Sequence, residues 1–205
     1  KIYTVPLNYY YELNPKEFLS AGFSYRRSDL KTPSSGAKTD YSDYKYSLGL
    51  RRDAVGNDAK LTGDINVGIN QRRPDVGKSE SSFNLDSKLS YAASQKISFT
   101  LGLSNDFGQS STGISQKTFR VNGGVNYAAN TEWNAAANGS YSSTDYTGTR
   151  RDNYWDAGFN VSWAGLESQY GAPLKLSYTY KNNSSNVPGS SYNGNTIALT
   201  AEAKY

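Results

Sequence analysis

The feature that most constrains this chain is an alternation of apolar and polar residues, which recurs in segment after segment along its length. The final stretch, 191–205, shows the pattern clearly, because every second residue from position 197 is apolar or aromatic and the others are mostly polar. Side chains of a β-strand point to opposite faces with a period of two, so each segment has one apolar and one polar face. The alternating residues of this stretch are Ile197, Leu199, Ala201, Ala203 and Tyr205.

The way this stretch ends favours a membrane barrel. A strand at the end of a soluble sheet exposes an edge that invites pairing with other chains. In a closed barrel the last strand pairs with the first, and a terminal aromatic residue such as Tyr205 lies at the membrane interface. The stretch therefore predicts an outer-membrane β-barrel.

The composition fits a barrel better than the other classes of protein. No stretch approaches 18 consecutive apolar residues, so a transmembrane helix is excluded. The mean hydropathy of −0.71 does not argue against a barrel, because half of each strand faces a polar lumen. The net charge of +4 comes from interspersed cations and anions, so we expect no nucleic-acid partner. Disorder would suit a chain rich in Ser, Asn and Gly, but the tyrosine-rich alternation argues against it.

Eleven segments show the alternation and predict eleven strands in a single domain over 1–205. Most are close to or above the 9–11 residues with which a tilted strand crosses a bilayer. Pro6 weakens the first segment, because proline cannot donate a hydrogen bond to a neighbouring strand. The predicted strands are 2–11, 17–28, 41–52, 59–72, 80–92, 97–108, 117–128, 133–146, 153–164, 174–181 and 192–205.

The predicted fold class is therefore all-β, an antiparallel up-and-down transmembrane β-barrel. Single-chain bacterial barrels have an even number of strands, so an odd count predicts at least one strand before Lys1. The chain would then be the C-terminal portion of a barrel of about 12 strands or more. The alternative is that one element has been divided wrongly.

The connections and the aromatic residues predict the orientation. Connections after even-numbered strands are longer in sum, and membrane barrels have longer loops outside than in the periplasm, which places the C-terminus in the periplasm. Tyr and Trp are favoured at both membrane interfaces, so aromatic residues near the strand ends predict two girdles, although Tyr is also a good strand former in general. The periplasmic girdle comprises Tyr11, Tyr91, Tyr127, Trp133, Trp163 and Tyr205, and the outer girdle Tyr25, Tyr44, Tyr141, Tyr180 and Tyr192.

Several stretches carry a family resemblance. They are PLNYYYELNPK (6–16), YRR (25–27), NDFGQSSTGISQK (105–117), TRRDNYWDAG (149–158) and YTYKNNSSNVPGSSYNGN (178–195). They resemble the putative beta-barrel porin-2 family of outer-membrane proteins, often found beside exopolysaccharide genes, and the resemblance covers essentially the whole chain. It implies a family barrel longer than this chain and no catalytic residues. Tyr205 departs from the more usual terminal Phe.

The sequence offers no catalytic or cofactor site, so we expect neither an enzyme nor a bound metal. Known kinds of barrel enzyme use a histidine to activate serine or water, and the chain has no His and no Cys. Two pairs of acids, Asp40 with Asp43 and Asp145 with Asp152, lie near the predicted outer rim and are interpreted as solvated loop acids. No phosphate-binding or calcium-binding motif is present in the sequence.

The polar faces of the predicted strands carry charges of both signs. In a channel such residues set ion preference and align dipolar solutes, whereas in a narrow barrel they would pair across the interior and plug it. The candidate lumen-lining residues are Arg26, Lys45, Arg51, Asp64, Asp86, Lys88, Asp106, Arg120, Asp156, Lys175, Lys181, Glu202 and Lys204.

These features predict a hydrophilic channel for small polar solutes or an exported polysaccharide. The alternative is a closed structural or docking barrel in an envelope assembly, since no external connection is long enough to fold in as a constriction. A secreted all-β adhesin is a third possibility, which solubility without detergent would favour. The expected partners are outer-membrane lipid, the barrel-assembly machinery through the C-terminal strand, and a polysaccharide or envelope protein.

Overall fold

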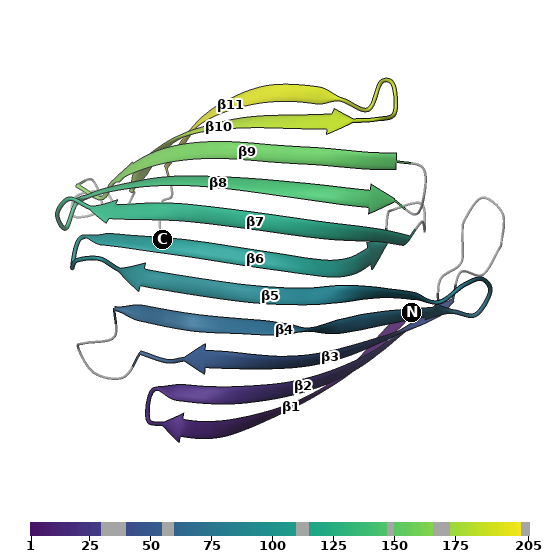
Figure 1. Cartoon of the computed structure of the whole chain (residues 1–205). Coiled ribbons are helices and arrows are strands. Elements are labelled where there is room, and N and C mark those ends of the chain that lie inside the picture. The colour runs from purple at the N-terminus through teal and green to yellow at the C-terminus, as the bar shows by residue number, and fades with distance from the viewer. Residues whose placement is uncertain (30–39, 55–59, 110–114, 147–149, 166–172, 202–205) are drawn as a thin grey trace.

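The structure, a computed structural model, describes residues 1–29, 40–54, 60–109, 115–146, 150–165 and 173–201. These residues form one sheet of eleven antiparallel strands, each paired with its neighbours in sequence (Figure 1). They contain no helix that is long and apolar enough to cross a membrane. The strands are β1 (Ile2–Asn14), β2 (Glu17–Ser28), β3 (Tyr41–Arg52), β4 (Leu61–Pro74), β5 (Glu80–Ala92), β6 (Ile97–Gln109), β7 (Ser115–Ala128), β8 (Trp133–Tyr146), β9 (Arg150–Trp163), β10 (Leu174–Ser185) and β11 (Tyr192–Ala201).

The predicted strands are confirmed, and the bounds of β2, β3, β5 and β8 match the prediction residue for residue. The strands β9 and β10 are longer than predicted at one shared end, where Asp152 pairs with Ser185. These polar residues continue the ladder without the apolar alternation that marks a strand in the sequence. The connections at this end are consequently shorter than predicted. This reduces the difference in summed length between the connections at the two ends of the sheet, on which the predicted orientation rests. The orientation stays a prediction.

The first strand tolerates its proline because of where it lies. Pro6 is paired in register with Ser24 of β2, and β1 forms an edge of the described sheet. A proline has no N–H to offer a ladder, and edge strands are the positions in sheets where this loss is accepted.

Burial of side chains in this sheet is the reverse of that in a water-soluble domain. Apolar side chains such as Leu48 and Ile69 are 66% and 57% exposed, whereas the fully buried side chains are Asn84 and Ser28. Tyr41 and Phe107 are the only buried hydrophobic side chains among the described residues. Strands that alternate in this way match a barrel wall, which shows apolar residues to lipid and polar residues to the lumen.

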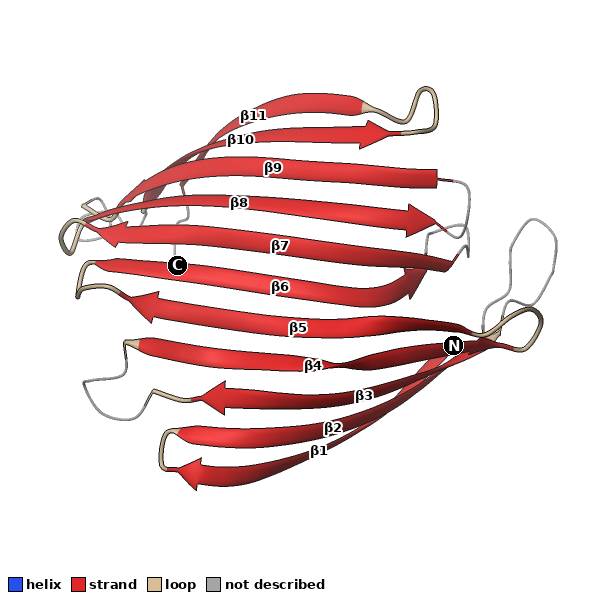
Figure 2. Ribbon diagram, in the orientation of Figure 1, coloured by secondary structure: helices blue, strands red, loops and turns tan. Residues whose placement is uncertain are grey.

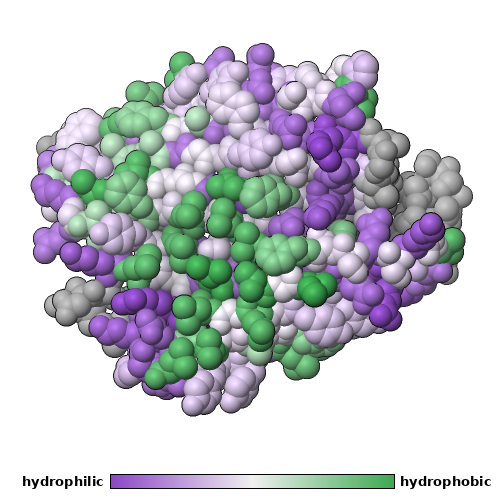
Figure 3. All heavy atoms as spheres, viewed as in Figure 1, coloured by the Kyte–Doolittle hydropathy of each residue, from purple (hydrophilic) through white to green (hydrophobic). Residues whose placement is uncertain are grey.

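The sheet is strongly curved. Figures 1 and 2 show that both edges turn away from the viewer, so the face in view is the convex one. Hydrophobic side chains gather across the middle of this face, and hydrophilic ones gather toward the strand ends (Figure 3). The polar residues therefore line the concave side, where a barrel has its lumen.

The strands β1 and β11 are the two edges of the sheet, and no pairing joins them within the described residues. All residues of β1 are exposed, on both faces. The architecture is the antiparallel up-and-down sheet of a transmembrane barrel, bent toward closure but not closed by these eleven strands.

Candidate functional site on the concave face

The register brings the predicted lumen residues to one side of the sheet. Residues directly opposite each other in an antiparallel pair share a face, and Asp64 lies opposite both Arg51 and Lys88 in this way. Glu202 and Lys204 lie outside the described residues. The predicted lumen residues on this concave face are Arg26, Lys45, Arg51, Asp64, Asp86, Lys88, Asp106, Arg120, Asp156, Lys175 and Lys181.

Three hollows follow one another along the concave face of β1–β6. The first, of about 490 Å³, lies near the β3–β4 connection and shares Tyr10, Ser20 and Asn66 with the second, of about 250 Å³. The second shares Ser24 and Lys45 with the third, of about 200 Å³. Because neighbouring hollows share lining residues, they form one continuous depression, which we name the polar track.

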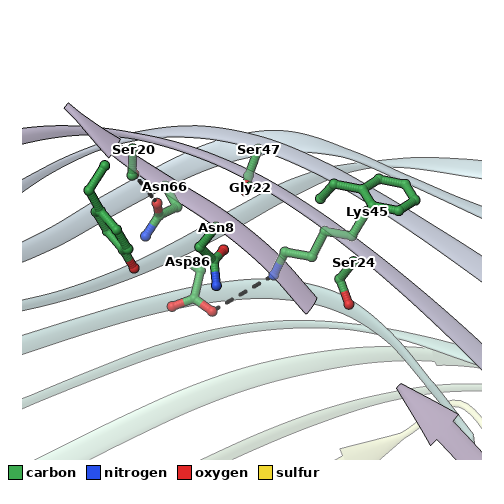
Figure 4. Close-up of a pocket in the computed structure, with 10 residues that line it drawn as sticks. Asn8, Ser20, Gly22, Ser24, Lys45, Ser47, Asn66 and Asp86 are labelled. Carbon is green, nitrogen blue, oxygen red and sulfur yellow. Dashed lines mark hydrogen bonds and ion pairs between the residues drawn. The ribbon is translucent and has the colours of Figure 1, made fainter. Parts of the chain in front are cut away.

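The middle of the polar track is lined by paired polar groups (Figure 4). Lys45 Nζ lies 4.0 Å from Asp86 Oδ2, and Ser20 Oγ donates a hydrogen bond to Asn66 Oδ1 at 3.0 Å. Asn66 Nδ2 donates in turn to Asp64 Oδ2 at 2.9 Å. Charges of both signs thus border the same hollow, and a polar solute would meet donors and acceptors along the track.

A glycine gives one of these side chains its room. Gly49 of β3 lies opposite Asn66 of β4, and a Cβ atom at Gly49 would lie 2.1 Å from Asn66 Oδ1 and 2.7 Å from the Ile65 carbonyl oxygen. Any larger residue would push Asn66 aside, so Gly49 lets that amide lie across β3 and join the polar track.

The third hollow ends at a group of buried ion pairs, the arginine–aspartate cluster of Arg26, Asp43 and Arg72. Arg72 donates from Nε to Asp43 Oδ1 at 2.7 Å and from Nη2 to Oδ2 at 2.8 Å. Arg26 donates to the same Oδ2 from Nε at 3.0 Å and from Nη2. The side chains of Arg72 and Asp43 are only 3% and 10% exposed. One carboxylate therefore neutralises part of the charge of two arginines in a place that solvent hardly reaches.

The two buried aromatic side chains, Tyr41 and Phe107, lie against the arginine–aspartate cluster. The guanidinium carbon of Arg72 lies 4.0 Å from the ring centroid of Tyr41 and 5.1 Å from that of Phe107. In the predicted strand 97–108, Phe107 has the same parity as the apolar residues Ile97 and Leu101, so the alternation predicts that it lies on the apolar outer face. That prediction is wrong, because the end of β6 bends toward the concave side, and Phe107 is buried there at 6% exposure.

Two of the acids interpreted as solvated loop residues have a different environment. Asp43 and Asp152 lie within β3 and β9, and each residue, backbone and side chain together, is 7% exposed. Asp152 accepts hydrogen bonds from Arg150, which lies two residues earlier in β9. Their assignment as solvated acids is therefore wrong, because each is held by arginine at the concave face. Asp145, by contrast, is half exposed and pairs with Arg151.

The concave face of the later strands is less filled. Ser140 Oγ donates to Asp156, and Thr118 and Thr144 share a hydrogen bond of 3.2 Å. No ion pair among the described residues links Arg120 or Lys181 to an acid within 4.0 Å. Apart from the Arg150–Asp152 pair of β9, the described residues of this half of the face therefore carry separated charges rather than a bonded cluster.

Most of the predicted girdle residues lie on the convex face, and two pairs of rings meet across strands, one stacked (Trp133 with Trp163) and one tilted (Tyr25 with Tyr44). The ring centroids of Trp133 and Trp163 are 5.8 Å apart, and those of Tyr25 and Tyr44 are 5.3 Å apart. Tyr192 is the exception, because it lies opposite Asn183, on the concave face, so its assignment to a lipid-facing girdle is wrong. The others on the convex face are Tyr11, Tyr91, Tyr127, Tyr141 and Tyr180, while Tyr205 lies outside the described residues.

The geometry offers polar contacts rather than reactive groups. Among the described residues, no three His, Cys, Asp or Glu side chains are grouped so that they could hold a metal ion. The arrangement can bind and order water, ions and polar solutes along the concave face.

Comparison with known proteins agrees with this geometry. The model of a family described as putative beta-barrel porin 2 matches residues 1–205. The chain belongs to this family. The family named from the sequence is thereby confirmed, and the chain is a porin-type β-barrel chain, of the class found in bacterial outer membranes. No curated protein matches it.

Two solved structures are similar to the sheet. One is the outer membrane channel DcaP of Acinetobacter baumannii, with 13% identity, a TM-score of 0.69, and 98% of this chain and 62% of that chain covered. The other is the FrpB iron transporter from Neisseria meningitidis, with 11% identity, a TM-score of 0.63, and 89% and 36% covered. The likeness shows a shared barrel fold, and the chain spans less than two thirds of either protein's length.

Proposed function

We propose that the full-length protein is a water-filled channel of the bacterial outer membrane that passes small polar solutes, with its C-terminus in the periplasm. The observation that carries the proposal is the polar track, a continuous hollow on the concave face of a sheet whose convex face is apolar. Mixed charges and amides along the track suit hydrated ions and dipolar solutes. Lipid contacts the convex face, and the last strand is the proposed contact for the barrel-assembly machinery.

Planar-bilayer recording of the full-length natural protein tests this function. The expected result is stepwise ion conductance from detergent-refolded protein that resists protease and unfolds only on heating. Protein that passes both folding checks and yet carries no current would overturn the channel function.

A polysaccharide is the second solute class to test. Support comes from the family resemblance and from the amide-lined and hydroxyl-lined track, which offers neutral donors and acceptors. Liposomes that contain the protein should then release or take up neutral oligosaccharides. Retention of all saccharides, together with passage of small ions, would restrict the function to small solutes.

A structural or docking barrel is the second candidate function. The observation that favours it is the bend of β6, which brings Phe107 against the arginine–aspartate cluster of β2–β4 and fills part of the concave side. Co-purification of a stoichiometric envelope protein, together with an absence of conductance, would support this candidate over the channel.

A further inference from the structure

The sheet splits between β5 and β6 at one end. The ladder that joins these strands ends where Leu85 lies opposite Asn105. Beyond this pair β5 stays with β4 as far as Glu80, and β6 stays with β7 as far as Gln109. Figure 1 shows the arrowhead of β6 turning away from β5. The Asn105 side chain partly bridges the split, because its Nδ2 donates to the Phe83 carbonyl oxygen at 2.6 Å.

The separated ends of β6 and β7 lie against the concave face of distant strands. Arg72 of β4 donates from Nη1 to the Gly108 carbonyl oxygen and to Ser115 Oγ, both at 2.8 Å. Arg26 of β2 donates from Nη2 to the Phe107 carbonyl oxygen at 3.2 Å. A ladder between neighbouring strands cannot make these contacts, so the ends of β6 and β7 must cross the inside of the sheet.

A second contact strengthens this position. Asn70 of β4 donates from Nδ2 to Asp106 Oδ1 at 2.6 Å. The same carboxylate oxygen accepts the backbone N–H of Phe107 at 2.8 Å. The side chain of Asp106 is therefore fixed at the point where β6 bends.

Arg72 joins the wall of the sheet to the bent strands. A guanidinium presents five donors in one plane, and here Nε and Nη2 bind Asp43 while Nη1 binds β6 and β7. The rings of Tyr41 and Phe107 lie within 4.0 and 5.1 Å of the guanidinium carbon. Four hydrogen bonds and two aromatic neighbours thus surround the group, and at 3% exposure it has little freedom to move.

The three hollows of the polar track become smaller toward this place. Its hollows fall from about 490 to 250 and then to 200 Å³. The smallest is bordered by Asp106 and Phe107 of the bent β6 on one side, and by Arg26 and Lys45 on the other.

We propose that the bent ends of β6 and β7, bound to the wall by Arg72, form the constriction of the channel. This inference rests on the proposed channel function and assigns its narrowest point. The sequence analysis found no external connection long enough to fold in as a constriction, and in this proposal the strand ends themselves do so without a long loop. Charged groups of both signs at the narrowest point would make this constriction the selectivity-determining part of the track.

The first test compares Arg72→Met with Arg73→Met in the full-length natural protein. Arg73 is the next residue along β4, and its guanidinium carbon lies 5.2 Å from the ring of Tyr44, on the convex face. Single-channel conductance should rise when Arg72 is replaced and stay at the natural value when Arg73 is replaced. Equal conductance of both variants and the natural protein would overturn the constriction and leave the channel function standing.

A second measurement remains decisive if Arg72→Met does not fold. These 205 residues contain no cysteine, so Asp106→Cys and the control Thr179→Cys each introduce one thiol here, and the natural protein treated with the same reagent gives the background. Thr179 lies on the concave face of β10, opposite Gly158 of β9. A bulky neutral thiol reagent should reduce the current through Asp106→Cys strongly and through Thr179→Cys little.

The possible results of these experiments distinguish the proposed constriction from the proposed channel function. An unchanged current after modification at position 106, or equal losses at both positions, would overturn the constriction. A folded natural protein without current would overturn the channel function and the constriction with it.

Discussion

Arg26 and Arg27 are consecutive residues at one end of β2, and they bind aspartates on opposite faces of the sheet. Arg26 binds Asp43 on the concave face, and Arg27 binds Asp75 with two hydrogen bonds of 2.7 Å. The two arginine side chains are almost equally exposed, at 31% and 29%. The acids differ, because Asp43 is 10% exposed and Asp75 is 48% exposed.

The comparison teaches that the location of the acid decides the role of the pair. Asp43 lies within β3 and binds both Arg26 and Arg72. Its loss would leave both arginines without an anion, and the side chain of Arg72 is buried. Asp75 lies in the connection 75–79, where water replaces a lost partner. Exposed ion pairs contribute little to stability, whereas removing one partner of a buried pair leaves an uncompensated charge.

The largest effect is expected from Asp43→Ala. Removing this carboxylate leaves Arg26 and the buried Arg72 without their shared anion, which should lower the free energy of unfolding by roughly 3–5 kcal/mol. Urea unfolding of the refolded protein in lipid vesicles, followed by tryptophan fluorescence, measures the change. Asp75→Ala is the matched control and should leave the urea midpoint close to that of the natural protein. Similar midpoints for both variants would show that the difference in burial has no energetic consequence.

The two faces can also be compared away from the ion pairs, at Ser47 and Leu48 of β3. Leu48 lies on the convex face between Ala21 and Val67, and an arginine there should cost about 2–4 kcal/mol if that face meets the bilayer centre. Ser47→Arg places the same charge on the concave face, where water solvates it, and should cost less. The ratio of folded to unfolded protein in vesicles measures both. A larger cost at Ser47 than at Leu48 would contradict the assignment of the faces.

A smaller effect is expected on ion selectivity, and it compares the two sides of the third hollow. Lys45→Gln removes a cation and should shift selectivity toward cations, whereas Asp106→Asn removes an anion and should shift it toward anions. A unit charge about 4 Å away in water is worth about 1 kcal/mol, so each permeability ratio should change by no more than roughly fivefold. Reversal potentials across a salt gradient measure these ratios. Shifts of the same sign in both variants would mean that the ions do not pass between these residues.

The sequence predicts the strands well because a barrel wall repeats one simple pattern. Alternation assigns a face to each residue, as Leu48 and Ile69 show, and it predicts the family architecture without knowledge of any contact. Alternation does not show how deeply a side chain is buried. Asp43 and Asp152 were therefore interpreted as solvated acids, although arginines bind both of them. Tyr192 has the parity of the polar residues Thr196 and Thr200, and this signal could have placed it correctly.

The candidate site was harder to predict than the fold, because it depends on a break in the pattern. Phe107 continues the apolar alternation of β6, yet the strand leaves β5 after Asn105 and carries Phe107 to Arg72. That contact joins residues 35 positions apart in sequence through a bend that local periodicity does not encode. Arg72 was not among the predicted lumen residues, although it has the parity of Asp64 on the same strand and alternation could have placed it on the concave face. Its hydrogen bonds to β6 and β7 could not be predicted in this way.

The smallest effect is expected from acid, and it isolates the outer pair of the opening comparison. The Arg27 guanidinium, which donates two hydrogen bonds to Asp75, lowers the pKa of that carboxyl below its ordinary value of 3.8. A carboxyl whose pKa is lowered in the folded state stabilises the fold above its unfolded pKa and loses this contribution as the pH falls through the folded pKa. The difference in urea midpoint between the natural protein and Asp75→Asn should therefore be small but constant near neutral pH, and should vanish only below pH 3.8. Taking this difference cancels the pH dependence of every group that the two proteins share. A difference in urea midpoint that disappears between pH 7 and pH 5 would mean that Arg27 does not bind Asp75 in the folded protein. The exposed Arg27–Asp75 pair could then not be compared with the buried Arg26–Asp43 pair.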